Sequence, residues 1–293
     1  IDRVLMGWLE ICAHSRTWCF LFAVAFGTAC LSVHCVAHFI FARLCPPPLN
    51  REPGFLAHQV VALLLMPLFA WLGCLGWLPL QISPSTPEDR IFGTFPISEV
   101  LAPLIAGSLL LWDIPTSLLV PKLYARATMA HHVAFAVIGI ISMYPYLQYY
   151  VPFFGGVIEM SSIPLAVVDV FHPKHPELET WARQNACVGL LNAFCRVLFA
   201  LLFVALRTIY FPWVVLTQML PDLVSVLMQG HARMGMVAAV VFTLSLALGF
   251  MFLQLYWSKL VIGQLLKAVR TLGSQQSTQP LENELLSESS PDD

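Results

Sequence analysis

Two adjacent histidines, His131 and His132, stand at the start of an apolar stretch that reads ATMAHHVAFAV. An aspartate, Asp113, lies on the preceding apolar segment, and only a short connector separates the two segments. A carboxylate behind an imidazole fixes the tautomer of the histidine and raises its basicity, which suits a general base or a nucleophile. The alternative is a His–Asp pair that only holds two helices together, and the residues by themselves favour neither interpretation.

The chain that positions these groups has the composition of a membrane protein. Of its 293 residues, 58% are hydrophobic and only 11% are charged, whereas about 25% of the residues of a soluble domain are charged. The apolar residues occur in blocks long enough for the roughly 20 helical residues that cross a bilayer. We therefore expect an all-α membrane protein with about seven transmembrane helices. The formal net charge of −2 and the lack of Lys/Arg-rich runs argue against a nucleic-acid partner.

The expected spans are separated by polar or proline-rich connectors. They lie at about residues 17–44, 56–79, 97–120, 129–145, 150–171, 184–212 and 234–263. Residues 213–233 either extend the sixth span or lie along the membrane interface, and the first residues, to about Ser15, are expected to form a short interfacial helix. The Ser/Gln/Glu-rich tail from about Gly273 cannot bury apolar area, so we expect it to be disordered.

The basic residues of the connectors predict the orientation. With the N-terminus outside, the cytoplasmic side holds eight basic residues and the opposite side holds four. The eight are Arg43, Arg51, Lys122, Arg126, Lys174, Arg183, Lys267 and Arg270, and the four are Arg3, Arg16, Arg90 and Arg233. The positive-inside rule then places the C-terminus in the cytoplasm.

Several polar side chains lie at membrane depth, where each is costly and therefore a candidate for function. In the third span Ser117 is one helical turn from Asp113, and Pro115 should kink the helix or free a carbonyl beside them. In the fifth span Glu159 shares a face with Ser162, and Pro164 should open a polar niche around them.

The sixth span carries a narrow polar stripe. At about 100° per residue, Asn185, Asn192, Arg196 and Arg207 fall within about 60° of one another on the helical wheel. Lipid does not solvate guanidinium groups, so the stripe should face the protein interior, where Arg196 or Arg207 is the natural counter-ion of Glu159 or Asp113. The arginines would then either stabilise the bundle or bind an anionic head group.

Together these residues predict an internal polar chamber that suits an amphipathic lipid. The expected catalytic set is His131, His132 and Asp113, and the expected substrate-binding set is Glu159, Ser162, Asn192, Arg196 and Arg207. We expect no metal site, because no two of the eight cysteines have C-x-x-C spacing and most lie inside apolar spans.

Five segments, taken in order, resemble the TLC-domain family, which includes the ceramide synthases. They are LLLWDIPTSLL, MAHHVAFAVIG, IEMSSIPL, FALLFVALRTIYFP and LQLYWSKL. The resemblance implies six of the helices forming a bundle around a polar cavity, in an intracellular membrane and usually that of the endoplasmic reticulum. It implies a TLC-like domain at residues 55–265, after an N-terminal segment and first helix at 1–54 and before a disordered cytoplasmic tail at 266–293.

One departure from the ceramide synthases bears on activity. In those enzymes a His-Asp pair follows the paired histidines on the next segment, and the whole signature supports transfer of an acyl group from acyl-CoA to a sphingoid base. Here FGGVIEMSS has Glu159 but no such pair. The chain is therefore more similar to the members that are not ceramide synthases.

Three functions remain open on the sequence. The first is a lipid acyltransferase, in which His131 or His132 is the base or the acyl acceptor, Asp113 orients it, and acyl-CoA is a co-substrate rather than a bound cofactor. The second is a non-catalytic, lipid-binding regulator of membrane lipid composition. The third is a transporter or channel, for which the sequence offers neither inverted repeats nor paired half-helices. Membrane lipid is the expected partner in the first two.

Overall fold

In the computed structural model the structure describes residues 16–78, 84–228 and 234–288, and every regular element among them is a helix. No strand occurs among them. The interfacial helix expected before Ser15 lies outside the described residues.

Among the described residues, six apolar helices are long enough to cross a bilayer, so the chain is a multi-pass membrane protein. They are Arg16–Leu44 (α2), Pro53–Trp77 (α3), Pro96–Leu119, Val151–Val170, Ala186–Met228 and Val237–Lys267. They correspond to six of the seven expected spans. The span expected at residues 184–212 continues through residues 213–228. The remaining expected span is Arg126–Ile141 (α7), whose 16 residues make a helix only about 24 Å long.

Of these six observed spans, counted in chain order, the last four are composite or extend beyond the membrane segment. The third consists of α5 (Pro96–Ser108), η3 (Leu109–Asp113) and α6 (Ile114–Leu119). The fourth consists of α8 (Val151–Phe154), η4 (Val157–Ser161) and α9 (Ser162–Val170). The fifth consists of α11 (Ala186–Leu202), η5 (Phe203–Tyr210), α12 (Phe211–Val214), η6 (Val215–Met219) and α13 (Leu220–Met228), and the last lies within α14 (Met234–Glu288).

Three stretches within the spans are π-helical, and each ends two residues before a proline. They are η3 before Pro115, η5 before Pro212 and η6 before Pro221. Proline has no N–H to donate, and its ring crowds the carbonyl four residues earlier, so the preceding turn widens. The distortion expected near Pro115 therefore takes the form of a wide turn that ends on Asp113.

Close backbone contacts hold the bundle together at glycines. Gly27 of α2 and Gly107 of α5 lie so close that a Cβ on either would meet backbone atoms of the other helix. Gly73 of α3 is equally close to Gly156, at the start of η4. Small residues let helices in a membrane approach in this way, and the second contact fixes the position of η4, the element that carries Glu159.

Residues of the connectors form ion pairs at both ends of the bundle. On one side, Glu52 pairs with Lys122 and with His175, which lies just before α10 (Pro176–Gln184) and stacks on Phe55. On the other side, Arg90 of α4 (Pro87–Phe92) binds both carboxylate oxygens of Asp222 on α13 at 2.6 Å. That hydrogen bond raises the pKa of Arg90 above its ordinary value.

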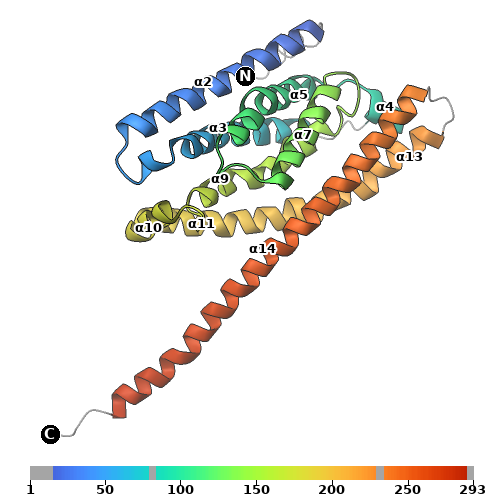
Figure 1. Ribbon diagram of the computed structural model, residues 1–293. Helices are drawn as coiled ribbons and strands as arrows, with labels where there is room; N and C mark the ends of the chain where they lie inside the picture. The colour runs from blue at the N-terminus through green and yellow to red at the C-terminus, as the bar shows by residue number, and fades with distance from the viewer. Residues whose placement is uncertain (1–15, 79–83, 229–233, 289–293) are drawn as a thin grey trace.

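The C-terminal segment corrects one expectation. Helix α14 continues to Glu288 and extends well beyond the bundle (Figure 1), whereas we expected disorder from about Gly273. The segment contains Gln, Glu and Leu, which favour helix, and it continues a helix that is already formed, so no new nucleation is needed.

Candidate functional site: an intramembrane polar chamber

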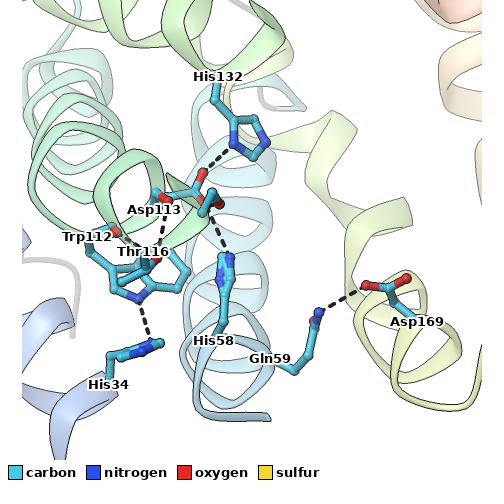
Figure 2. Close-up of polar contacts among 9 residues, drawn as sticks. His34, His58, Gln59, Trp112, Asp113, Thr116, His132 and Asp169 are labelled. Carbon is cyan, nitrogen blue, oxygen red and sulfur yellow. Dashed lines mark hydrogen bonds and ion pairs between the residues drawn. The ribbon is translucent and has the colours of Figure 1, made fainter. Parts of the chain in front are cut away.

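The carboxylate of Asp113 lies between two histidines from different helices. Its Oδ2 is 2.6 Å from Nδ1 of His132 on α7, and its Oδ1 is 3.1 Å from Nε2 of His58 on α3. Ser117, one turn further along, donates to Oδ1 at 3.4 Å. Figure 2 shows the two imidazoles approaching the carboxylate from opposite sides. Asp113 is only 5% exposed, and a carboxylate buried this deeply needs such partners.

The two adjacent histidines have different surroundings. The expected contact between Asp113 and one of them is present, and His132 makes it. The carboxylate lies outside the line of a straight hydrogen bond from Nδ1, so the 2.6 Å approach is a close polar contact without good hydrogen-bond alignment. The ring of His131 instead packs against Phe135, Phe250 and Trp257, with centroids 4.7, 5.2 and 5.6 Å away. Its buried Nδ1 has no hydrogen-bond partner among the described residues.

The contacts around Asp113 continue outward to further helices (Figure 2). Trp112 donates a long hydrogen bond of 3.4 Å to His34 of α2, and Gln59 donates to Asp169 of α9 at 3.1 Å. Polar contacts therefore link α2, α3, η3, α7 and α9 at this depth, which limits how far Asp113 can move.

A second polar group surrounds Arg207 of η5, which is buried. Its guanidinium donates to the hydroxyl oxygens of Ser161 and Ser162 at 2.7 and 2.9 Å and to the carbonyl of Ile158 at 3.5 Å. It also lies 3.5 Å from the carboxylate of Glu159. Of the pairings that the sequence left open, Arg207 with Glu159 is the one formed. The polar niche expected near Pro164 is present, and Arg207 fills it.

The two polar groups interact electrostatically with each other. Glu159 lies within electrostatic range of His132, and Arg207 lies within range of His131. We call the side chains of His58, Asp113, His131, His132, Glu159 and Arg207, with the two serines, the polar chamber. No group of three or more His, Cys, Asp or Glu side chains in the described ranges is arranged to hold a metal ion.

An apolar cavity adjoins the chamber. It is narrow and partly open, with a volume of about 50 Å³, and is lined by residues of α5, α7, α8 and α14, among others. Two of its lining side chains, Phe135 and Phe250, are the same aromatic rings that contact His131. The polar chamber and the apolar cavity therefore meet at His131.

A comparison with known protein families matches residues 68–263 to the TLC domain (TRAM, LAG1, CLN8). The chain belongs to the TLC-domain family. No curated protein and no solved structure matches the chain. The matched residues include Asp113, both adjacent histidines, Glu159 and Arg207, whereas His58 lies ten residues before the matched segment.

Two residues expected in the chamber of this TLC domain lie elsewhere. Arg196 is exposed, donates to the carbonyl of Phe171 at 3.1 Å and to Asn192 at 3.2 Å, and contacts neither Asp113 nor Glu159. Asn192 lies beside it on α11. The predicted polar stripe was wrong because the helical wheel assumes a regular α-helix throughout the span. The π-helical turn of η5 begins between Arg196 and Arg207 and changes the direction in which Arg207 points.

Sequence reasoning missed His58. It lies in the second expected span, in FLAHQVVALL, as an isolated histidine without a neighbouring motif. Its depth in an apolar segment was the available signal, because an ionisable side chain inside a span needs a polar partner. Its identity as the second partner of Asp113 depends on how α3 packs beside η3, which the sequence does not specify.

Proposed function

We propose that this TLC-domain protein binds an amphipathic lipid, with the polar head in the chamber and the hydrocarbon tail in the apolar cavity. The observation that carries the proposal is the position of His131, whose ring contacts the chamber on one side and the cavity rings of Phe135 and Phe250 on the other. A molecule that occupied both would need a polar end and an apolar end.

Buried polar atoms without partners support this proposal. Nδ1 of His58, Nδ1 of His131 and Oε1 of Gln254 make no hydrogen bond with any described residue. Gln254 lies on α14 between Phe250 and Trp257, the two residues of that helix that contact His131. Leaving such atoms unpaired costs free energy, and a lipid head group with donors and acceptors would remove part of that cost.

We further propose that the chamber transfers an acyl group from acyl-CoA to the bound lipid. The hydroxyl or amine of the acceptor lipid attacks the thioester carbonyl, a C–O or C–N bond forms, and the C–S bond breaks. His132 takes the proton of the acceptor at Nε2, since its Nδ1 faces Asp113, and then gives it to the departing thiolate of coenzyme A. Asp113 orients His132 and stabilises the imidazolium that forms.

One observation favours a non-catalytic alternative, in which the protein binds lipid and regulates membrane lipid composition. Both oxygens of Asp113 are occupied by histidines, and Glu159 is paired with Arg207. A chamber with this much internal pairing is also what a purely structural or binding role would require.

The family and the basic connectors support a location and an orientation. We propose residence in the endoplasmic-reticulum membrane with the C-terminus in the cytoplasm. The side that carries Arg43, Lys122, Arg126 and Lys174 would then be cytoplasmic. Acyl-CoA would bind from that side.

Purified protein in nanodiscs tests these proposals. Bound lipid is identified by mass spectrometry, and turnover is measured with labelled acyl-CoA for wild type, His131→Ala and His132→Ala. His38→Ala is the matched control, because His38 is an exposed histidine of α2 outside the chamber. Turnover that His132→Ala abolishes, while lipid binding and His38→Ala activity persist, supports the acyltransferase. Retained lipid without turnover from any acyl donor rejects the enzyme and favours the regulator.

A further inference from the structure

A second apolar feature lies on the outside of helix α7. It is a groove between α7 and α14, lined by Tyr124, Arg126, Met129, Ala130, Val133, Ala134, Val137, Phe242 and Leu246. We call it the α7–α14 groove. It is open to the surroundings, and no residue of the polar chamber lines it. Its smallest lining side chains are those of Ala130 and Ala134 on α7.

The chemistry of the groove changes along its length. From Met129 to Leu246 every lining residue is apolar, whereas the end at the start of α7 carries Tyr124 and Arg126, both exposed. Within the described ranges Arg126 has no ion pair or hydrogen bond. The nearby cation Lys122, by contrast, is paired with Glu52. The groove therefore presents one uncompensated positive charge, at one end.

The length of the groove matches one leaflet. Arg126 and Val137 are eleven residues apart, or about 17 Å along the helix axis, and half of a typical hydrocarbon core is about 15 Å. An aromatic and a basic side chain at this boundary are the usual contacts of a lipid head group. An acyl chain could lie on the alanines from there to the bilayer centre.

We propose that the α7–α14 groove is a specific binding site for an anionic phospholipid. The phosphate and the acidic head group bind Arg126 and Tyr124, and one acyl chain lies between α7 and α14. A packed partner helix is the rival occupant. It would fit the alanines but would leave Arg126 without an anion. The site is separate from the polar chamber and does not depend on the function proposed for it.

The two helices that line the groove, α7 and α14, also line the internal cavity. Ala134 and Val137 line the groove, while the adjacent Phe135 and Ile138 line the internal cavity. On α14 the same alternation holds for Phe242 and Leu246 outside and for Thr243 and Ala247 inside. The contact between α7 and α14 is thus a single-layer wall between the bound phospholipid and the internal cavity.

The test uses the full chain in nanodiscs that contain photoreactive phosphatidylserine or, separately, photoreactive phosphatidylcholine. After illumination, labelled peptides are mapped by mass spectrometry. We expect phosphatidylserine to label residues 126–137 of α7 and the facing part of α14 more strongly than phosphatidylcholine does. Arg126→Ala should reduce this labelling about fivefold, the effect of removing one basic contact at an anionic surface. Ala134→Trp, which fills the groove, should abolish it.

Two controls keep the result interpretable. Arg183→Ala removes an exposed arginine of α10 that pairs with Glu179, and Leu190→Trp places the same tryptophan at an exposed position of α11. Neither should change labelling of the groove. Equal labelling by both lipids that is indifferent to Arg126→Ala would mean ordinary annular lipid and would overturn the proposal. Self-association in native mass spectra that Ala134→Trp abolishes, without lipid labelling of the groove, would overturn it in favour of a partner helix.

Discussion

Oδ2 of Asp113 lies 2.6 Å from Nδ1 of His132, and this contact joins the π-helical turn of the third span to helix α7. Neither residue could be moved by one position along its helix without losing the contact, because successive residues point about 100° apart. The widened turn before Pro115 is therefore part of the site, since it determines where Asp113 points.

Asp113→Asn tests whether this carboxylate orients a base. Asparagine keeps the size of the side chain but removes the charge that would stabilise a protonated His132. If the chamber is catalytic, we expect acyl-transfer turnover to fall by about a hundredfold or more, with bound lipid retained. Turnover that stays at the wild-type level would show that Asp113 only holds the helices together.

His58→Ala tests the second partner of Asp113. The substitution leaves Oδ1 with only the long hydrogen bond from Ser117, so we expect a loss of stability of about 1–3 kcal/mol, typical of a buried polar group that loses its partner. The measurement is thermal unfolding of the purified protein in detergent. The exposed His38→Ala should leave the unfolding temperature unchanged, and an equal shift in both variants would contradict the assignment.

Arg207→Met tests the buried ion pair. Glu159 would lose its cation, and we expect a loss of about 3–5 kcal/mol. Glu159→Gln should cost less, because Arg207 keeps its bonds to Ser161 and Ser162. The double variant should recover part of the loss of Arg207→Met. Arg196→Met is the matched control at an exposed arginine. Additive effects in the double variant would argue against the pair.

Gly73→Val tests the close approach of α3 to η4. A side chain at Gly73 would meet the backbone at Gly156 and Val157, so η4 must shift and carry Glu159 away from Arg207. We expect at least about 1–3 kcal/mol of destabilisation, as for an overpacked core, together with loss of bound lipid. Gly249→Val is the control, because a Cβ at Gly249 of α14 meets nothing within 4 Å. Full lipid occupancy in Gly73→Val would contradict this role.

His172, which lies outside the membrane spans, should make the stability of the protein depend on pH. Burial lowers the pKa of His172 below its ordinary 6.5, and Lys174 lowers it further. Its Nδ1 accepts the backbone N–H of Lys174 at 3.1 Å, which requires an unprotonated nitrogen. The unfolded chain therefore binds a proton first as the pH falls, and stability should be constant above about pH 6.5 and decrease below it.

The measurement for His172 is the unfolding temperature of wild type and His172→Gln between about pH 7.5 and 5.5. The effect should be small, because the side chain is partly exposed. The difference between the two proteins should change only below about pH 6.5. A difference that does not vary with pH would remove His172 from this role.

Much of the architecture could be predicted from the sequence. Apolar blocks of spanning length predict the helices, and the order of Asp113, the paired histidines and Glu159 indicates the family. The pairing of Asp113 with an adjacent imidazole follows from the short connector between their helices.

The remaining features depend on backbone geometry that residue types do not specify. The wide turn at η5 alters the helical wheel, so Arg196 leaves the predicted stripe while Arg207 faces the interior. His58 joins the site only through the packing of α3 against η3. The helical course of α14 to Glu288 depends on continuation of an existing helix, which composition alone does not reveal.

The central claim is that the polar chamber and the apolar cavity bind one lipid, and occupancy after filling the cavity tests it most directly. Ala247→Trp adds bulk to a buried cavity-lining residue of α14, and Leu255→Trp places the same tryptophan at an exposed position of that helix. Lipid retained through purification is quantified by mass spectrometry. We predict a defined lipid in wild type and Leu255→Trp that is lost from Ala247→Trp. The same lipid at the same occupancy in all three proteins would contradict the claim.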